Sequence, residues 1–376
     1  MHREVGDSVV VITGASSGIG RAAALKFARL GTTVVLTSRR EEALLRLAER
    51  CENLGGRALA MPADVTDQQA IQSLARRAVD AFGRIDVWIN NAAVTLFARF
   101  ENSPPETYRR VIETNLFGCI HGARAALPYF REQGSGTLIN ISSGLGRIGS
   151  PYVSAYAASK FAIIGLSESL RMELQDAPDI HVCTVLPAAI DTPLFQHGAN
   201  FMGRAAQPIA PIYSAEKVAD ALVDVVRHPR REIIVGNAVK LGLMMHAIAP
   251  GLTERIYAKQ VEKKHFQDRP APPTEGNLFK AMEQYEDVSG GWRAGNSNLP
   301  FSSSIGCIAL SSLVAISVSP EFFSLTRIDF IFLAGSFRDR VLGETLALAV
   351  KQNWPLFQVL AHTLDGKVSG ASWSAS

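Results

Sequence analysis

The run Thr13-Gly-Ala-Ser-Ser-Gly-Ile-Gly20 constrains the fold more than any other stretch of this chain. It follows the apolar, β-branched residues 8–12, which are typical of a buried parallel strand. Strong helix formers occupy residues 21–30, and Gly31 ends them. A glycine-rich loop between a strand and a helix can hold a dinucleotide pyrophosphate against the free N–H groups of the helix N-terminus. An ordinary glycine-rich turn is the alternative that this loop alone leaves open.

Strands and helices are predicted to alternate along the chain. The predicted strands are 8–12, 34–37, 58–61, 87–90, 137–141, 181–186 and 232–235. The predicted helices between them include 41–54, 67–81, 105–131 and 152–175. This alternation predicts an α/β fold, a Rossmann-type doubly wound parallel sheet of about seven strands with helices on both faces. Ligands of such sheets bind beyond the carboxyl ends of the strands.

A tyrosine and a lysine share one face of a predicted helix, because Tyr156 and Lys160 are four residues apart. A free tyrosine has a pKa near 10, and a nearby ammonium group together with the positive charge of a nicotinamide lowers it toward the range in which a phenol can act as a base. Ser143 follows the fifth predicted strand, thirteen residues before Tyr156, and can donate to a carbonyl oxygen. Many helices contain Tyr-x-x-x-Lys by chance, so the serine gives the pattern its specificity. Ser142 does not match that spacing.

Taken in order, these residues resemble the short-chain dehydrogenase/reductase family. The glycine spacing is Gly-x-x-x-Gly-x-Gly, and the resemblance covers roughly residues 5–290. The other matching positions are Asp64, Asn90 to Ala93, Asn115, Ser143, Tyr156 with Lys160, and Pro187 with Thr192. The resemblance implies that the catalytic residues are Asn115, Ser143, Tyr156 and Lys160.

The same resemblance implies a set of residues that bind a nicotinamide cofactor. They are Gly14, Ser16, Ser17, Gly18, Ile19, Gly20, Arg39, Asp64, Val65, Asn91, Ala92, Tyr156, Lys160, Pro187, Ile190 and Thr192. Asp64 resembles the residue that bonds the adenine amine, although an aspartate here could also serve only the entry of the next helix. Ala188 stands where most members of the family have glycine, and its methyl group lies near the expected nicotinamide.

The end of the second predicted strand indicates which cofactor is used. NAD-specific sites usually offer an acidic residue there for the ribose hydroxyls, whereas this chain has Ser38-Arg39-Arg40. Arg39 can hold a 2′-phosphate with its planar fork of donors, so NADP (NADPH) is the predicted cofactor. Arg40 is the weaker candidate and is expected to face water. Two arginines that only begin a solvated helix are the alternative.

The predicted function is an NADP-dependent oxidoreductase that interconverts a carbonyl and a secondary alcohol by hydride transfer. Ser143 would polarise the oxygen, Tyr156 would exchange the proton, Lys160 would tune Tyr156, and Asn115 would serve a proton relay. No metal is required. An NADP-binding regulatory or scaffold protein on the same fold is the alternative, since a fold does not fix function. An epimerase-like or dehydratase-like use of the same site also stays open.

Composition and charge exclude several other classes of protein. The net charge of +3 is too small to indicate a nucleic-acid partner. The four cysteines, at positions 51, 119, 183 and 307, have no paired spacing and indicate a reducing compartment, so a cytoplasmic location is expected. The first predicted strand begins at residue 8, which leaves no room for a signal peptide. A homodimer or homotetramer is compatible with the family resemblance.

A long loop is expected after the sixth strand, over residues 194–213. Loops of this length in compact domains are usually functional or disordered, and this one is expected to cover the substrate. Its Phe195, Phe201 and Met202 favour an apolar carbonyl or alcohol substrate. Further on, an apolar stretch at 239–257 could cover the pocket or dock a partner, and residues 268–276 are predicted as a proline-rich spacer.

The composition changes after Arg293. Residues 294–320 carry no charge, and charges are sparser throughout the remaining chain than before it. We therefore expect a catalytic domain over 1–293 and a C-terminal extension over 294–376. Within the extension, residues 301–318 are near the minimum length for a membrane span. A buried helix or a weakly ordered tail is favoured over membrane contact, because serines dilute the apolar run.

Overall fold

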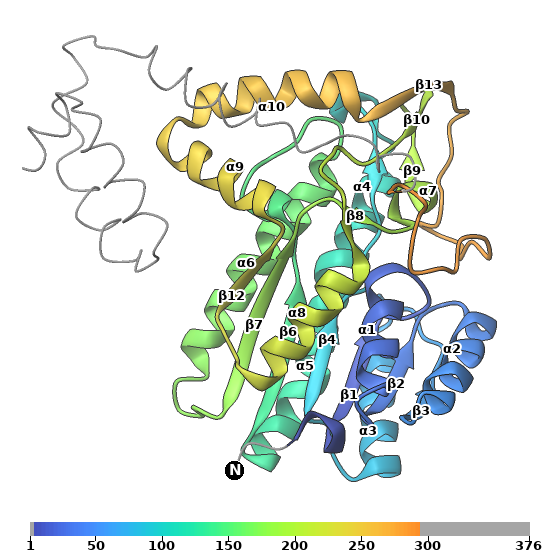
Figure 1. Ribbon diagram of the computed structural model, residues 1–376, viewed down its shortest axis with the longest axis vertical. Coiled ribbons are helices and arrows are strands. Elements are labelled where there is room, and N and C mark those ends of the chain that lie inside the picture. Colours follow the sequence, from blue (N-terminus) through green and yellow to red (C-terminus); the bar gives the residue numbers. More distant parts are fainter. Residues whose placement is uncertain (1–3, 294–376) are drawn as a thin grey trace, which may run out of the picture. The chain divides into compact units, whose positions relative to one another are not determined.

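The computed structural model describes residues 4–293, which are built around one seven-stranded sheet (Figure 1). The strand order is β12-β7-β6-β4-β1-β2-β3, and every neighbouring pair is parallel. The strands are β1 (Val9–Thr13), β2 (Thr33–Thr37), β3 (Arg57–Ala60), β4 (Val87–Asn90), β6 (Gly136–Ile141), β7 (Ile180–Pro187) and β12 (Glu232–Val235). The predicted fold class is confirmed, and each predicted strand lies within one or two residues of an observed one.

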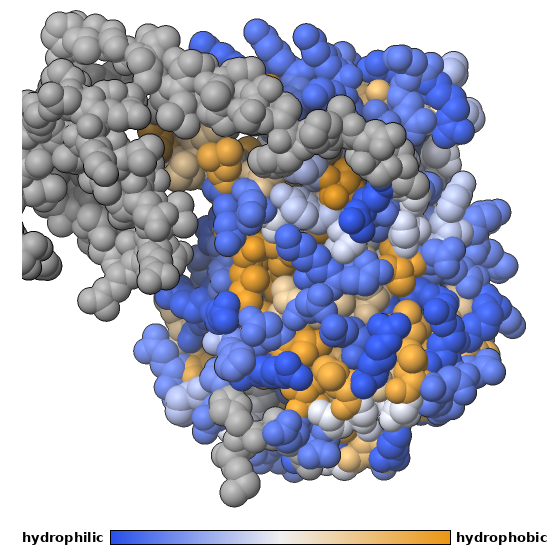
Figure 2. All heavy atoms as spheres, viewed as in Figure 1, coloured by the Kyte–Doolittle hydropathy of each residue, from blue (hydrophilic) through white to orange (hydrophobic). Residues whose placement is uncertain are grey.

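Helices cover both faces of this sheet. One face carries α1 (Gly18–Ala28), α2 (Glu41–Asn53) and α8 (Ala215–Arg227). The other carries α3 (Gln68–Phe82), α5 (Gly118–Gln133) and α6 (Ser154–Glu173). Figure 2 shows mostly hydrophilic side chains along the outer edge formed by α2, whose buried residues all lie on its inner side.

Strand β1 shows how the sequence forms two cores. Successive side chains of a strand point to opposite faces, so Val10 and Ile12 pack under α1 and α8, whereas Val9 and Val11 pack under α3 and α5. All five residues of β1 are buried. A strand that is covered on both faces has to be apolar throughout, and this explains the unbroken β-branched run in the sequence.

The strand order reverses between β1 and β4. From β1 the chain proceeds outward through β2 and β3, and it then returns to place β4, β6, β7 and β12 on the other side. The loops after β1, β2, β4, β6 and β7 therefore meet at one edge of the sheet. This edge is where a doubly wound sheet binds its ligands.

The helix predicted over 105–131 is interrupted by a wider turn. It consists of α4 (Pro105–Ile112), a π-helical turn η3 (Glu113–Phe117) and α5. A π-turn adds one residue to the helical repeat, and such turns are frequent at functional sites. Asn115 lies in the middle of this turn.

The segment predicted as a loop over 194–213 contains short ordered elements. They are α7 (Leu194–His197), β9 (Ala199–Asn200), β10 (Arg204–Ala206) and β11 (Tyr213–Ser214). These strands pair with β5 (Leu96–Phe97), β8 (Ile190–Asp191) and β13 (Phe266–Pro270). The description as a loop was wrong because each strand is too short to show a pattern and pairs with partners distant in the chain. Part of the predicted proline-rich spacer is likewise β13.

The last described helices form a pair beyond β12. They are α9 (Asn237–Ile248) and α10 (Pro250–Lys264), and they contact each other. The remaining short elements are η1 (Val5–Asp7), η2 (Phe100–Asn102) and η4 (Gly144–Gly146). Among residues 4–293, no helix combines the length and the apolar character needed to cross a membrane. The apolar stretch 301–318, Cys307 and the proposed extension 294–376 lie outside the described residues.

Candidate active site

The glycine loop after β1 is held by the segment that follows β4. The Asn91 amide nitrogen Nδ2 donates to the carbonyl oxygens of Thr13 at 2.9 Å and Gly14 at 3.2 Å. The backbone N–H groups of Asn91 and Ala92 both donate to the Thr13 hydroxyl. Gly14 has a φ of +65°, and a Cβ atom there would lie 2.7 Å from the Ala92 Cα atom. Only glycine allows this approach, so Asn91 and Ala92 position the loop.

The second half of the loop opens helix α1. Gly18 begins the helix with a φ of +55°, and Ser17 is the N-cap residue in extended conformation. Ile19 packs against the core, and Gly20 lies directly on the carbonyl group of Gly14. The N-terminus of α1 therefore presents backbone N–H groups next to glycines, whose lack of side chains leaves the backbone open to close approach. This arrangement fits a phosphate group.

Two arginines follow β2, and both guanidinium groups point into the described molecule. Arg39 donates to the carbonyl oxygens of Asn277 and Leu278, the latter at 3.0 Å. Arg40 donates to the Ser16 hydroxyl from Nε at 3.1 Å and from Nη2 at 3.0 Å. The expectation that Arg40 faces water was wrong, because a serine of the glycine loop and the chain beyond residue 276 lie within its reach.

Asp64 takes part in an ion pair with Arg110 rather than in helix entry. Its carboxylate lies 2.6 Å from Arg110 Nη2 and 4.0 Å from Arg39 Nη1, and it accepts two hydrogen bonds from Thr66. Burial alone would raise the pKa of Asp64, but the Thr66 hydrogen bonds and the two arginine charges together hold that pKa below its usual value. Asp67, not Asp64, caps α3.

Ser143 and Tyr156 lie within hydrogen-bonding contact, on opposite sides of the turn η4. Ser143 follows β6 and caps η4, and Tyr156 lies in the first turn of α6. Lys160 follows one turn later, is 2% exposed, and has its Nζ atom 5.4 Å from the centre of the Tyr156 ring. Lys160 Nζ donates to the Ile141 carbonyl oxygen at 2.8 Å. The structure thus brings together the serine, tyrosine and lysine that the sequence indicated. Ser142 instead donates to the Lys160 carbonyl oxygen.

The surroundings of Tyr156 within the chain itself raise its pKa. Burial raises the pKa of Tyr156 to about 12, and the hydrogen bond with Ser143 opposes this only in part. Burial also lowers the pKa of Lys160 to about 8. Water stabilises both charged forms better than the protein interior does, so the phenolate and the ammonium are each disfavoured. Lys160 is itself desolvated and donates to a backbone carbonyl, and the positive charge of a nicotinamide, the other expected cause of a lowered Tyr156 pKa, acts only when the cofactor is bound.

Asn115 is fully engaged by its side chain. Its Oδ1 accepts from the Val94 N–H at 2.8 Å, and its Nδ2 donates to the Val94 carbonyl oxygen and to the Ser159 hydroxyl, each at 3.0 Å. These bonds join the π-turn to the strand-end segment after β4 and to α6, the helix of Tyr156. The Asn115 side chain therefore holds the π-turn at a fixed distance from the segment after β4 and from α6.

The segment after β7 completes this edge of the sheet. Pro187 ends β7, Ile190 begins β8, and Thr192 is buried beside Gly18. The carboxylate of Asp191 accepts hydrogen bonds from the Ser289 hydroxyl and from the backbone N–H groups of Gly290 and Trp292. The carbonyl oxygen of Val65, another of the expected cofactor-binding residues, accepts a hydrogen bond from the His121 ring nitrogen Nδ1 at 2.9 Å.

An aromatic cluster lies beside Tyr156. Its members are Phe97, Tyr152, Phe195, His265, Phe266 and Trp292, with neighbouring ring centres between 5.4 and 6.4 Å apart. Tyr156 packs against the part of it that contains Phe97 and Phe266. Burial lowers the pKa of His265 to about 4, and its Nδ1 atom has no hydrogen-bond partner among residues 4–293. The imidazole is therefore neutral near pH 7.

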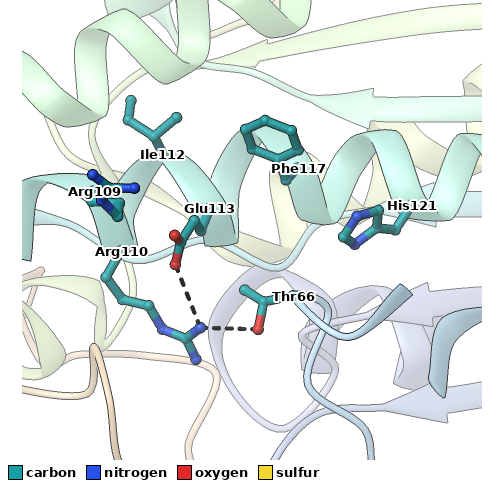
Figure 3. A pocket seen from close by; sticks show the side chains of 7 residues that line it. All are labelled: Thr66, Arg109, Arg110, Ile112, Glu113, Phe117 and His121. Carbon is teal, nitrogen blue, oxygen red and sulfur yellow. Dashed lines mark hydrogen bonds and ion pairs between the residues drawn. The ribbon is translucent and has the colours of Figure 1, made fainter. Parts of the chain in front are cut away.

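A surface pocket of about 550 Å³ lies on the outer side of α4, η3 and α5 (Figure 3). Arg110 and Glu113 point toward each other at its floor, and Phe117 and His121 line the part toward α5. None of its lining residues is Ser143, Tyr156, Lys160 or a residue of the glycine loop. We therefore place the candidate chemistry at the sheet edge and not in this pocket.

Sequence reasoning missed three parts of the site. Arg40 was set aside, and His265 was not considered because an isolated histidine gives no signal. The chain from Asn277 to Trp292 was also missed, although it contacts the glycine loop and both arginines. Its contacts are made largely by backbone carbonyl groups, which leave no pattern in a sequence.

The fold and the sheet-edge residues define a class of protein. The chain belongs to the short-chain dehydrogenase/reductase family, whose sequence profile, described as short chain dehydrogenase, matches residues 8–203. The protein is accordingly an oxidoreductase of this family, which uses NAD or NADP.

Individual relatives agree with this assignment. The chain is 37% identical over 278 residues to a Bacillus subtilis (strain 168) protein named uncharacterized oxidoreductase YxnA, across 73% of this chain and 78% of the relative. It is similar to a short chain dehydrogenase/reductase from Burkholderia phymatum in complex with NAD, with a TM-score of 0.60, 25% identity, and coverage of 72% of this chain and 100% of that one.

A second solved structure carries a different dinucleotide. It is an alcohol dehydrogenase from the archaeon Thermococcus sibiricus complexed with 5-hydroxy-NADP. The TM-score is 0.54 and the identity 26%, over 60% of this chain and 95% of that one. The two structures thus support a nicotinamide dinucleotide without deciding between NAD and NADP.

Proposed function

We propose that the protein is an NADP-dependent oxidoreductase that interconverts a carbonyl and a secondary alcohol. The observation that carries the proposal is the hydrogen-bonding contact between the partly buried residues Ser143 and Tyr156, with the buried Lys160 one helical turn away. A proton donor, a hydroxyl that can polarise an oxygen and an ammonium group in one place suit the proton half of such a reaction. When bound, the nicotinamide supplies or accepts the hydride.

The protein's own residues handle the oxygen and its proton. Ser143 donates a hydrogen bond to the substrate oxygen, and Tyr156 gives or takes the proton at that oxygen. Because burial raises the pKa of Tyr156, the phenol is protonated, which is the form that carbonyl reduction requires. In the oxidative direction, a positive charge near the phenol is needed to favour the phenolate. Lys160 supplies this charge only while it is protonated.

We assign Asn115 a positioning role in the path by which the proton leaves or reaches Tyr156. Its side chain is occupied by Val94 and Ser159, so a proton relay would use its backbone carbonyl group, which lies in the π-turn. The Ser159 hydroxyl also donates to the Tyr156 carbonyl oxygen at 2.7 Å. Asn115 is therefore connected to Tyr156 through one residue.

The assignment of NADP rests on the end of β2. Arg39 and Arg40 provide two guanidinium groups there, and no carboxylate occupies the adjoining position, Ser38. Guanidinium groups are suited to phosphate and would be poorly matched to bare ribose hydroxyls. The proposed phosphate-binding groups are the loop residues Gly14 to Gly20 and Thr192, and Asn91 and Ala92 support that loop.

The substrate class follows from the aromatic cluster. Phe97, Phe195 and Phe266 form an apolar surrounding next to Tyr156, in which Phe97 and Phe266 are buried, so we assign a bulky apolar carbonyl or alcohol as the substrate. The unpartnered Nδ1 atom of His265 provides one polar contact within this apolar wall. Self-association as a homodimer or homotetramer belongs to the same proposal, and the mass of the native protein in solution would test it.

Turnover on a substrate panel tests the proposed function. Purified full-length protein is incubated with aromatic, alicyclic and short aliphatic ketones and NADPH, and with the matching alcohols and NADP. We expect oxidation of NADPH with bulky apolar ketones, and slower oxidation with NADH. Binding of NADPH without turnover of any compound would favour the regulatory or scaffold alternative.

A further inference from the structure

A segment of the chain itself crosses the dinucleotide site. This segment, residues 277–292, is called the strap, and it follows β13 at the end of the described chain. Figure 1 shows it running between α7 and the helices α1 and α2, over the carboxyl ends of β1 and β2. These strand ends carry the glycine loop and the two arginines.

Both ends of the strap are anchored. At one end, Leu278 is fully buried in a cluster with Val94 and Leu96. At the other end, Trp292 donates from its backbone N–H to Asp191 at 2.9 Å and from its indole nitrogen to the Thr192 carbonyl oxygen at 3.1 Å. The strap is therefore a packed part of the site and not a loop that happens to lie near it.

The strap accepts a hydrogen bond from the end of α1 that is proposed to bind phosphate. The backbone N–H of Gly18 donates to the carbonyl oxygen of Asp287 at 3.0 Å. Gly18 is the first residue of α1, where free N–H groups and the helix dipole favour an anion. A backbone N–H has one hydrogen to donate, so Gly18 cannot serve a pyrophosphate oxygen and Asp287 at the same time.

The strap also uses both arginines. Arg39 donates to the carbonyl oxygens of residues 277 and 278. Arg40 donates from Nη1 to the carbonyl oxygens of Met282 at 3.1 Å and Gln284 at 3.2 Å. These are the same donors that would recognise the 2′-phosphate of NADP. Helix α7 adds a further bond, from the His197 ring to the Gln284 carbonyl oxygen.

The charge of the strap resembles that of the ligand it covers. It contains Glu283, Glu286 and Asp287 against a single lysine, Lys280. Glu286 lies 2.6 Å from Arg46 of α2. An acidic chain with rows of carbonyl oxygens satisfies the basic groups and the helix N-terminus much as an anionic dinucleotide would.

We propose that the strap is an intramolecular ligand of the dinucleotide site, which the nicotinamide cofactor must displace before it can bind. The proposal rests on the proposed function, since it takes the ligand to be NADP or NADPH. Displacement makes the apparent dissociation constant larger than the intrinsic one, in proportion to the fraction of molecules whose strap is open. Loosening the strap should therefore tighten cofactor binding, whereas loosening a clamp that holds the cofactor would weaken it.

The first test measures NADP binding by titration calorimetry on full-length variants. Leu278→Ala removes the apolar anchor and Trp292→Ala removes the indole part of the other anchor. Lys280→Ala is the matched control, because Lys280 is an exposed strap residue without a described contact. We expect each anchor variant to bind NADP at least about fivefold more tightly than the unmodified protein, and the control to be unchanged. Equal or weaker binding by both anchor variants would overturn the proposal.

Hydrogen exchange of the unmodified full chain provides a second readout that does not depend on turnover. The backbone N–H groups of Gly290 and Trp292 are protected by Asp191, so saturating NADP should accelerate their exchange. Slower exchange would identify the strap as a clamp and refute displacement.

The two proposals fail in different ways. NADP that binds with equal affinity to all variants, with strap exchange unchanged, would remove the strap proposal and leave the oxidoreductase proposal standing. Tighter binding and faster strap exchange without turnover of any carbonyl compound would remove only the proposed activity. No binding of any nicotinamide dinucleotide to any variant would remove both.

Discussion

The ammonium group of Lys160 lies 5.4 Å from the centre of the Tyr156 ring, and Lys160 is buried whereas Tyr156 is partly buried. Burial disfavours the charge of each group, so the pair is poised with a protonated phenol and a readily deprotonated amine. This is a different electrostatic state from that of an exposed Tyr-x-x-x-Lys pair, and it determines the first two predictions.

Replacing Tyr156 by phenylalanine should abolish turnover without weakening cofactor binding. The substitution removes only the hydroxyl that exchanges the proton, and positioned acid–base groups contribute about 10²–10⁴ in rate. Steady-state kinetics with an accepted ketone and calorimetry with NADPH would measure both quantities. Tyr129→Phe is the matched control, because Tyr129 lies in α5, packs against the core under α3 and α5, and has no part in the candidate site. Wild-type rates in Tyr156→Phe would show that the mechanism is wrong.

The buried Lys160 should make the free energy of unfolding rise with pH. Its pKa is about 8 in the folded protein and near 10.4 in an unfolded chain. Between these values the unfolded state binds more protons than the native state, so stability increases as pH increases from about 8 to 10. Tyr156 acts in the opposite direction from about pH 9 upward, because the unfolded tyrosine, with a pKa near 10, loses its proton before the folded one.

Urea unfolding at pH 8 and at pH 10 would reveal this contribution. In Lys160→Met the increase between the two pH values should be smaller than in the unmodified protein. Lys240→Met, which changes an exposed lysine of α9, should keep the full increase. An identical pH response in all three proteins would contradict the prediction.

Arg39 should give NADPH its advantage over NADH. A charge-assisted hydrogen bond contributes about 1.5–3 kcal/mol, which corresponds to a preference of roughly tenfold or more. Dissociation constants for the two cofactors should therefore differ in the unmodified protein and converge in Arg39→Ala. Arg57→Ala is the control, since Arg57 is exposed at the opposite end of the sheet. Equal affinities before mutation would refute the assignment of NADP.

Replacing Asn115 by alanine should destabilise the protein as well as slow it. The substitution leaves the buried N–H and C=O groups of Val94 without their partners, and each unsatisfied group costs about 1–3 kcal/mol. Urea denaturation would measure the loss in unfolding free energy. Asn53→Ala, at the end of α2, is the comparison. An Asn115→Ala protein of unchanged stability would mean that its side chain does not hold the π-turn.

Removal of residues 294–376 should leave an active catalytic unit. The sheet, the candidate site and the strap all lie within residues 4–293. The chain shortened at Arg293 and the full chain would be assayed and fractionated by high-speed centrifugation. A folded but inactive short chain would show that the extension completes the site. Full-length protein that sediments with membranes, when the short chain does not, would identify the extension as a membrane anchor.

Local and regular features were accessible from the sequence. The buried strands could be predicted because parallel strands covered on both faces are apolar throughout. The glycine loop, Ser143, Tyr156 and Lys160 could be found because their spacing follows from strand ends and helix turns. The π-turn around Asn115 could not, since one extra residue in a turn barely alters the helical pattern of hydrophobic residues.

Features that depend on burial or on distant backbone were not accessible. The raised pKa of Tyr156 depends on how completely the surrounding chain excludes water, which no local pattern reports. Arg40 was misjudged because its partners Met282 and Gln284 are more than 240 residues away and contribute carbonyl oxygens. Any residue type could supply such a carbonyl, so the sequence gives no sign of it.

The strap follows the strands of the sheet in the sequence, so the ribosome makes it after them. The last strand of the sheet ends at Val235, whereas the strap extends to residue 292. A ribosome adds roughly 5–20 residues per second, so the strands and the glycine loop exist for several seconds before their internal competitor is made. During that interval the Asp287 carbonyl group does not yet compete with a dinucleotide for the Gly18 N–H. A newly made molecule would then bind dinucleotide before its strap can occupy the site. Enzyme purified from cells should therefore contain more dinucleotide than the same enzyme that is unfolded and refolded before the ligand is added.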